Sequence, residues 1–303
     1  MTKKFVIGHK NPDTDSVVSA IVFSKYLKNG SIPAIAGELN RETRFVLDFL
    51  KGKKPKILKK APVNSQFYLV DHGGLEQSIP GINSEDILGV VDHHQMFGLT
   101  TVEPLFYRTE VLGSTSTLLA KMFKEKGWKI DKKSAGLLLS GIISDTLNFT
   151  SKTTTTEDKK IAKELVIISG INIKELAQKM FDAKSDISGM SIREIVLSDY
   201  KEYKHLGKKI GIGVFETVST TPFKGKDEKI LKILGDIKKE SKADFVFFGL
   251  IDILKKETFF YLLSDKEDGI CKKAFGVSGK DVIVLKGITS RKKQLVPYIF
   301  KSI

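Results

Sequence analysis

The sequence contains a single cysteine, Cys271, and no long run of apolar residues. One thiol can form neither an intrachain disulfide nor a thiolate metal cluster, and such sparing use of cysteine is typical of a reducing compartment. No apolar stretch approaches the roughly 18 residues that a membrane-spanning helix needs, and the first residues lack the hydrophobic segment of a signal peptide. We therefore expect a cytoplasmic protein without a membrane partner.

Arginine is also scarce, although the chain is strongly basic. The formal net charge is +14 over 303 residues, yet arginine occurs only at positions 41, 44, 108, 193 and 291. Sites that recognise bases, or that bind phosphates through paired hydrogen bonds from a planar group, favour arginine. The lysines here recur at helical spacing, which is typical of solvent-exposed helix faces. We therefore expect no nucleic-acid partner. A small anionic substrate is equally compatible with the charge.

Hydrophobic patterning predicts an α/β fold for residues 1–184. Short apolar strands, such as 32–36, 66–70 and 87–91, alternate there with amphipathic helices. This alternation favours a doubly wound, mainly parallel sheet.

The pattern changes after a polar stretch at 185–190, which we interpret as a linker. Residues 191–303 are predicted to form a second, smaller, mixed α/β domain. A helix over 192–206 is expected to begin this domain and to carry Lys201.

Acidic residues and histidines follow the strands of the first predicted domain. The carboxyl ends of parallel strands lie along one edge of a sheet, where open α/β sheets place their sites, so we expect these turns to be neighbours in space. A buried helix over 134–143 leads to one more acid, whose burial requires a partner, either a metal or a hydrogen bond at the helix end. The candidate residues are His9, Asp13, Asp15, Asp71, His93, His94 and Asp145.

A run of small residues at 113–117 opens another helix. The free N–H groups of such a helix start either bind an anion or are satisfied by an ordinary side-chain cap. The sequence leaves both interpretations open.

The combination of imidazole and carboxylate groups without thiolate suits Mn, Co, Fe or Zn in octahedral-like sites better than a structural zinc. Seven candidates exceed the needs of one ion, and two ions ~3.5–4 Å apart, sharing one carboxylate and a bridging water, would suit hydrolysis at phosphorus. Lys201, Arg291 and Lys292 could then neutralise the phosphate. Neither a Walker loop nor a His-Glu-x-x-His motif is present.

Five motifs in order give the chain a resemblance to the family II inorganic pyrophosphatases, the manganese-dependent members of the DHH phosphoesterase superfamily. The resemblance covers essentially the whole chain. The motifs are Gly8-His9-Lys10-Asn11-Pro12-Asp13-Thr14-Asp15-Ser16, Val70-Asp71-His72, Val91-Asp92-His93-His94, Ser144-Asp145-Thr146 and Ser290-Arg291-Lys292-Lys293-Gln294.

The resemblance implies a DHH-type metal-binding domain over 1–184 and a substrate-clamping domain of the DHHA2 type over 191–303. It implies two Mn2+ or Co2+ ions per subunit, additional Mg2+ arriving with pyrophosphate, and a homodimer formed through the first domain. The implied activity is hydrolysis of pyrophosphate to two orthophosphates, with a metal-bridging water as the nucleophile.

The resemblance also implies a role for each site residue. His9, Asp13 and Asp71 would hold one ion, and Asp15, Asp71, His93 and Asp145 the other, so that Asp71 bridges. Asp92 would orient His93 without contacting a metal. The catalytic residues would be His94, which contacts the substrate, together with Lys201, Arg291 and Lys292, which bind its phosphates.

Two other classes of function remain as alternatives. Exopolyphosphatases and phosphodiesterases that cleave oligonucleotides belong to the same superfamily. In related exopolyphosphatases Asn replaces the first histidine and the third motif reads Asp-His-Arg, whereas His9 and His94 occupy these positions here. A nucleic-acid-binding exonuclease or non-enzymatic module would instead require arginines interleaved with aromatic residues in the second domain.

Overall fold

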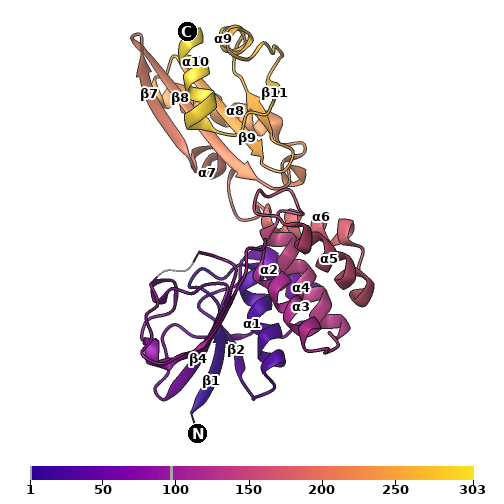
Figure 1. The fold of residues 1–303 in the computed structure, drawn as a ribbon. Coiled ribbons are helices and arrows are strands. Elements are labelled where there is room, and N and C mark those ends of the chain that lie inside the picture. The colour runs from indigo at the N-terminus through magenta and orange to yellow at the C-terminus, as the bar shows by residue number, and fades with distance from the viewer. Residues whose placement is uncertain (1, 96–97) are drawn as a thin grey trace. The chain divides into compact units, whose positions relative to one another are not determined.

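The computed structural model describes residues 2–95 and 98–303 and divides the chain into two compact units, 1–184 and 185–303. Among the described residues, no helix has both the length and the apolar character needed to cross a bilayer. Each unit contains one sheet, and Figure 1 shows the helices α1–α6 gathered beside the strands β1, β2 and β4 of the first unit.

The first unit is built on a six-stranded, all-parallel sheet. The strands are β1 (Lys3–Ile7), β2 (Ile32–Ile35), β3 (Lys56–Ile57), β4 (Ser65–Val70), β5 (Ile87–Asp92) and β6 (Phe106–Thr109). The helices are α1 (Thr14–Leu27), α2 (Arg41–Phe49), α3 (Thr115–Glu125), α4 (Lys132–Asp145), α5 (Thr156–Ser169) and α6 (Ile173–Lys184).

The strands lie in the order β3-β2-β1-β4-β5-β6, and all five pairings are parallel. The order reverses between β1 and β4, which is the arrangement of a doubly wound sheet and the point where such sheets bind ligands. The α/β prediction for this part of the chain is therefore confirmed.

The two faces of this sheet are covered differently. Phe23 of α1 packs its ring against Tyr68 of β4 on one face. On the other face, the stacked rings of Phe5 and Phe67 belong to a core that Ile79 and other residues of the crossover after β4 complete. That crossover contains only short 3-10 helices, at Leu75–Gln77 and Ser84–Asp86, so the residues after Val70 remain close to the strand end.

The second unit contains a five-stranded mixed sheet in the order β11-β10-β9-β8-β7. Its strands are β7 (Tyr200–His205), β8 (Lys208–Thr217), β9 (Phe245–Asp252), β10 (Glu257–Tyr261) and β11 (Val282–Lys286). Its helices are α7 (Ile192–Leu197), α8 (Asp227–Ser241), α9 (Asp265–Phe275) and α10 (Val296–Ser302), and a π-helical turn at Arg291–Leu295 precedes α10. Only β8 and β9 pair in parallel, as a mixed domain requires.

The prediction of one helix over 192–206 is wrong. Helix α7 ends at Leu197, and Lys201 lies on β7, which pairs antiparallel with β8. Leu206 and Gly207 both have positive φ, 46° and 73°, which is the conformation of a two-residue hairpin turn. This local turn joins the two strands and overrides the weak helical pattern.

Candidate metal centre

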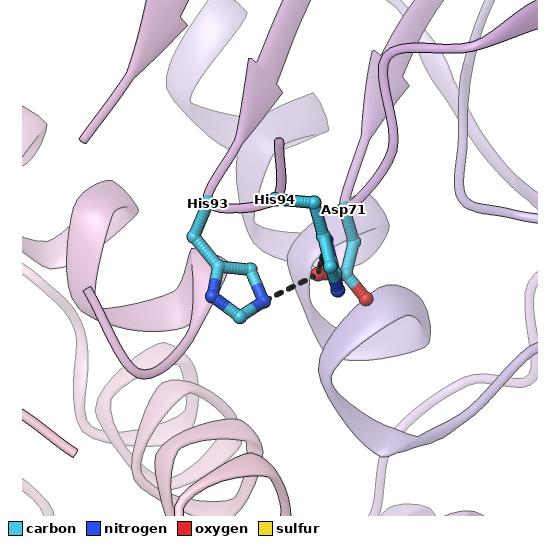
Figure 2. Close-up of side chains that lie close together, drawn as sticks. All are labelled: Asp71, His93 and His94. Atoms are coloured by element: carbon cyan, nitrogen blue, oxygen red, sulfur yellow. Dashed lines mark ion pairs between the residues drawn. The ribbon is translucent and has the colours of Figure 1, made fainter. Parts of the chain in front are cut away.

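Most of the candidate ligands follow three adjacent parallel strands. β1 pairs with β4 and β4 pairs with β5, so the segments after Ile7, Val70 and Val91 meet at one edge of the sheet. The backbone of Asp71 is in the left-handed region, with φ of 62°. Asp is one of the few residues other than glycine that adopt this conformation at low cost. Figure 2 shows the side chains of Asp71, His93 and His94 converging from the ends of β4 and β5.

The described residues form three overlapping groups of potential ligand atoms. They are His9, Asp13 and Asp71; Asp15, Asp71, His93 and Asp145; and Asp71, His93 and His94. Within each group the donor atoms lie within 4.8 Å of one another, and Asp71 belongs to all three. The structure therefore brings together all six residues that the sequence assigned to metal binding.

The closest distances in these groups suit metal ligands better than hydrogen-bond partners. His9 Nε2 lies 3.4 Å from Asp71 Oδ2, and His93 Nε2 lies 3.4 Å from Asp71 Oδ1 and 3.3 Å from Asp145 Oδ2. Asp71 Oδ2 and His93 Nε2 are buried and form no hydrogen bond. Ligands at ~2.1 Å from one ion are ~3 Å or slightly more apart. The residues present therefore fit divalent metal ions.

The electrostatics of the centre also favour cations. Burial raises the pKa of Asp145 to about 7, and burial, with the carboxylates of Asp145 and Asp71, raises the pKa of Asp15 well above its usual range. Burial alone would lower the pKa of His9 and His93, but nearby carboxylates raise these values to about 10 and about 12. Anionic groups thus crowd one buried region, where a divalent cation relieves their repulsion.

Asp15 is held by the N-terminus of α3, the helix start for which both an anion and an ordinary side-chain cap were possible. Thr115 N and Ser116 N, in the first turn of α3, donate to the Asp15 carboxylate over 2.7 and 3.1 Å, and Ser116 Oγ also donates to it. Ser114 is the N-cap of the same helix and accepts a bond from Thr117 N. Both interpretations therefore hold, because the anion at the helix start is the buried carboxylate of Asp15.

The two histidines after β5 have different partners. His93 Nδ1 donates to the carbonyl oxygen of Leu112 over 3.0 Å, which directs Nε2 at Asp71 and Asp145 as the nitrogen in position to bind a metal ion. His94 is half exposed, and its Nδ1 lies 2.9 Å from Asp92 Oδ1.

Asp92 contacts His93 through the backbone rather than through the ring. Its Oδ1 accepts from His93 N over 2.8 Å and from His94 N over 3.1 Å. The orienting contact to the His93 ring comes instead from Leu112, which sequence patterns did not indicate. His72 is no candidate ligand, because its two ring nitrogens bond to Val70 O and Ser78 Oγ.

The remaining predicted residues belong to the second unit. Lys201 is exposed on β7, and Arg291 and Lys292 lie in the π-helical turn before α10. The guanidinium of Arg291 is largely buried and donates to the carbonyl oxygen and to the carboxylate of Asp199, the latter over 2.7 Å. Asp199 thus fixes the orientation of Arg291 within this unit.

Comparisons with known proteins cover the whole chain. Residues 3–142 match the DHH family, N-terminal domain, and residues 178–302 match the DHHA2 domain. The manganese-dependent inorganic pyrophosphatase of Bacillus subtilis is 37% identical over 99% of this chain and 98% of its own length. That of Methanocaldococcus jannaschii is 39% identical over 97% of both chains. A crystal structure from Methanococcus jannaschii, assigned to the family II inorganic pyrophosphatases, covers 99% of both chains with 37% identity and a TM-score of 0.62.

Proposed function

The chain belongs to the family II manganese-dependent inorganic pyrophosphatases, and on this basis we propose that it hydrolyses pyrophosphate to two orthophosphates at the His/Asp centre of its first unit. The observation that carries the proposal is that the group with His9 and Asp13 and the group with Asp15, His93 and Asp145 share Asp71. A shared carboxylate is what a centre for two closely spaced ions requires.

In this proposal His9, Asp13 and Asp71 hold one Mn2+ or Co2+ ion, and Asp15, Asp71, His93 and Asp145 hold the other. When bound, such a pair supplies an acidified water for attack on phosphorus and stabilises the charge that develops on the phosphate oxygens. The deep burial of Asp15 and Asp71 excludes bulk water from the ligand shell and so strengthens its interaction with the ions.

The protein groups around the ions have complementary roles in the proposal. His94, held at Nδ1 by Asp92, keeps Nε2 available for a substrate phosphate oxygen. Lys201, Arg291 and Lys292 bind the phosphates, and Mg2+ accompanies the substrate. Because Asp199 already orients the Arg291 guanidinium, little side-chain entropy is lost when it binds an anion.

The assembly and location of the protein are part of the same proposal. We propose a homodimer formed through the first unit, where β6 is an edge strand of the sheet and Phe106 on it is exposed. We also propose a cytoplasmic location, since the lone Cys271 is a buried, free thiol.

The test is orthophosphate release from pyrophosphate, tripolyphosphate and a short oligonucleotide, each assayed with Mn2+ and with Mg2+. We expect Mn2+-activated turnover of pyrophosphate and its loss in Asp71→Asn, which removes the shared charge. A preference for tripolyphosphate would indicate an exopolyphosphatase, and a preference for the oligonucleotide a phosphodiesterase. Either result would contradict the proposal.

A further inference from the structure

Another buried carboxylate, Glu42, lies beside the metal centre but belongs to none of the groups of ligand atoms. It sits in the first turn of α2, and its side chain is 1% exposed. An anion this deeply buried is costly unless it is paired and hydrogen-bonded. Its partners therefore indicate what the residue does.

All the partners of Glu42 converge on one oxygen, Oε2. Thr14 Oγ1 donates to it over 3.0 Å, Ser144 Oγ over 2.8 Å and Lys184 Nζ over 3.4 Å. The other oxygen, Oε1, is buried and forms no hydrogen bond. Glu42 thus joins the start of α1, the end of α4 and the end of α6 through a single atom.

Both hydroxyl partners are sequence neighbours of the proposed ligands. Thr14 lies between Asp13 and Asp15, and Ser144 immediately precedes Asp145. The two segments lie far apart in the sequence, and Glu42 bonds to both of them. Thr14 is further tied by Thr43, whose hydroxyl lies 3.0 Å from its own.

We propose that Glu42 is a positioning residue for the metal centre: it holds Thr14 and Ser144 so that Asp13, Asp15 and Asp145 point at the same ions, and Lys184 neutralises its charge. This inference rests on the proposed function, because it concerns the assembly of the same ligands. Groups that orient ligands from behind typically contribute 10–100-fold to metal affinity. Since Glu42 acts through neighbours of the ligands, we expect an effect at the lower end, about tenfold.

Because all three partners bond to Oε2, the effect of the two hydroxyl hydrogen bonds can be measured separately from the effect of the negative charge on Glu42. Glu42→Gln can place its carbonyl oxygen at the Oε2 position and its amide at the unbonded Oε1 position, which keeps both hydroxyl bonds. Glu42→Met has a similar length but lacks any acceptor, so it releases both hydroxyls without opening a large cavity. Calorimetric titration of Mn2+ into metal-free protein gives the affinity and the number of ions for each variant.

We expect Glu42→Met to weaken Mn2+ binding about tenfold and Glu42→Gln to stay close to the wild type. If Glu42→Met lowers only the urea midpoint and leaves the Mn2+ affinity unchanged, Glu42 is merely structural and the inference is overturned. If Glu42→Met does not fold, Ser144→Ala removes one of the two held hydroxyls with minimal loss of volume, and unchanged affinity in that variant also overturns the inference.

Lys184 is tested separately, with a control on the same helix. Lys184→Met leaves the buried carboxylate without its cation, whereas Lys179→Met removes an exposed pair with Glu175 and a contact with the Phe49 ring, and leaves the pair of Glu42 and Lys184 in place. We expect a lower urea midpoint for Lys184→Met than for Lys179→Met, and equal midpoints would contradict the role of Lys184. If the wild type itself binds no Mn2+, the proposed function fails. Normal binding by wild type and Glu42→Met alike contradicts this inference alone.

Discussion

Gly141 in the middle of α4 offers a sharp test of how Asp15 is held. Replacing an interior helical glycine by alanine normally stabilises a protein by roughly 0.5–1 kcal/mol, because alanine loses less backbone entropy on folding. At Gly141, however, a Cβ would lie closer than 3.0 Å to Asp15 Oδ1 and to Ser116 Oγ. Asp15 is fully buried and cannot move into solvent. The substitution must therefore displace the carboxylate or the hydroxyl that bonds to it.

The expected loss of stability in Gly141→Ala follows from the overpacking and from the hydrogen bond that is lost. Overpacking of a buried site costs about 1–3 kcal/mol, and loss of the hydrogen bond from Ser116 to the Asp15 carboxylate costs about 1.5–3 kcal/mol. After the helical gain is subtracted, Gly141→Ala should lower the free energy of unfolding by roughly 2–5 kcal/mol. Because Asp15 is a proposed ligand, Mn2+ binding should weaken as well.

The assay is urea unfolding of the metal-free protein, followed by calorimetric titration of Mn2+. The matched control is Gly235→Ala in α8, where no described atom outside the adjacent helix backbone lies within 4 Å of the added Cβ. The free energy of unfolding of this control should rise by up to ~1 kcal/mol. If Gly141→Ala is as stable as the control and binds Mn2+ normally, Gly141 does not pack closely against Asp15.

Two further predictions concern other parts of the molecule. Arg291→Ala should leave Mn2+ affinity unchanged but lower turnover of pyrophosphate by about 10²–10³-fold, as expected for loss of a group that stabilises developing charge. Near-normal turnover would refute the proposed role of Arg291 in binding the phosphates. Asp131 caps α4, and although burial opposes it, hydrogen bonds from Ser134 and the ammonium of Lys25 lower its pKa to about 2. Asp131→Ala should therefore lower the free energy of unfolding by about 1 kcal/mol above pH ~4. In urea unfolding, this difference from the wild type should shrink as the pH falls toward 2 and the carboxylate is protonated. A cost that is the same at both pH values would contradict the cap as its source.

The strands and the clustering of the candidate ligands at their ends could be predicted because two simple signals coincide there. Apolar β-rich runs such as Phe67–Val70 end abruptly in Asp or His, and parallel pairing then brings the strand ends together. The prediction failed at Lys201, where tyrosines on β7 and the hairpin turn at 206–207 outweigh a weak helical pattern.

The groups that support the ligands could not be predicted in the same way. Thr115 and Ser116 look like an ordinary helix start, and their N–H groups find Asp15 only because α3 packs against α1. Glu42 has the pattern of a solvent-exposed acid at the start of an amphipathic helix, yet it is buried. These contacts join segments far apart in the sequence, so they depend on the tertiary fold rather than on local patterns.

The candidate metal centre combines residues after β1, β4 and β5 with residues of α1 and α4, and this has a consequence for the dynamics of the first unit. The last proposed ligand, Asp145, is the final residue of α4, so a fragment of the first unit that stops before Asp145 lacks part of the ligand set. Ions that bind only the complete set stabilise that set against every opening that separates its members. Mn2+ should therefore slow amide hydrogen exchange across β1, α1, β4, β5 and α4 together, as one cooperative unit, rather than only in the loops that touch the ions.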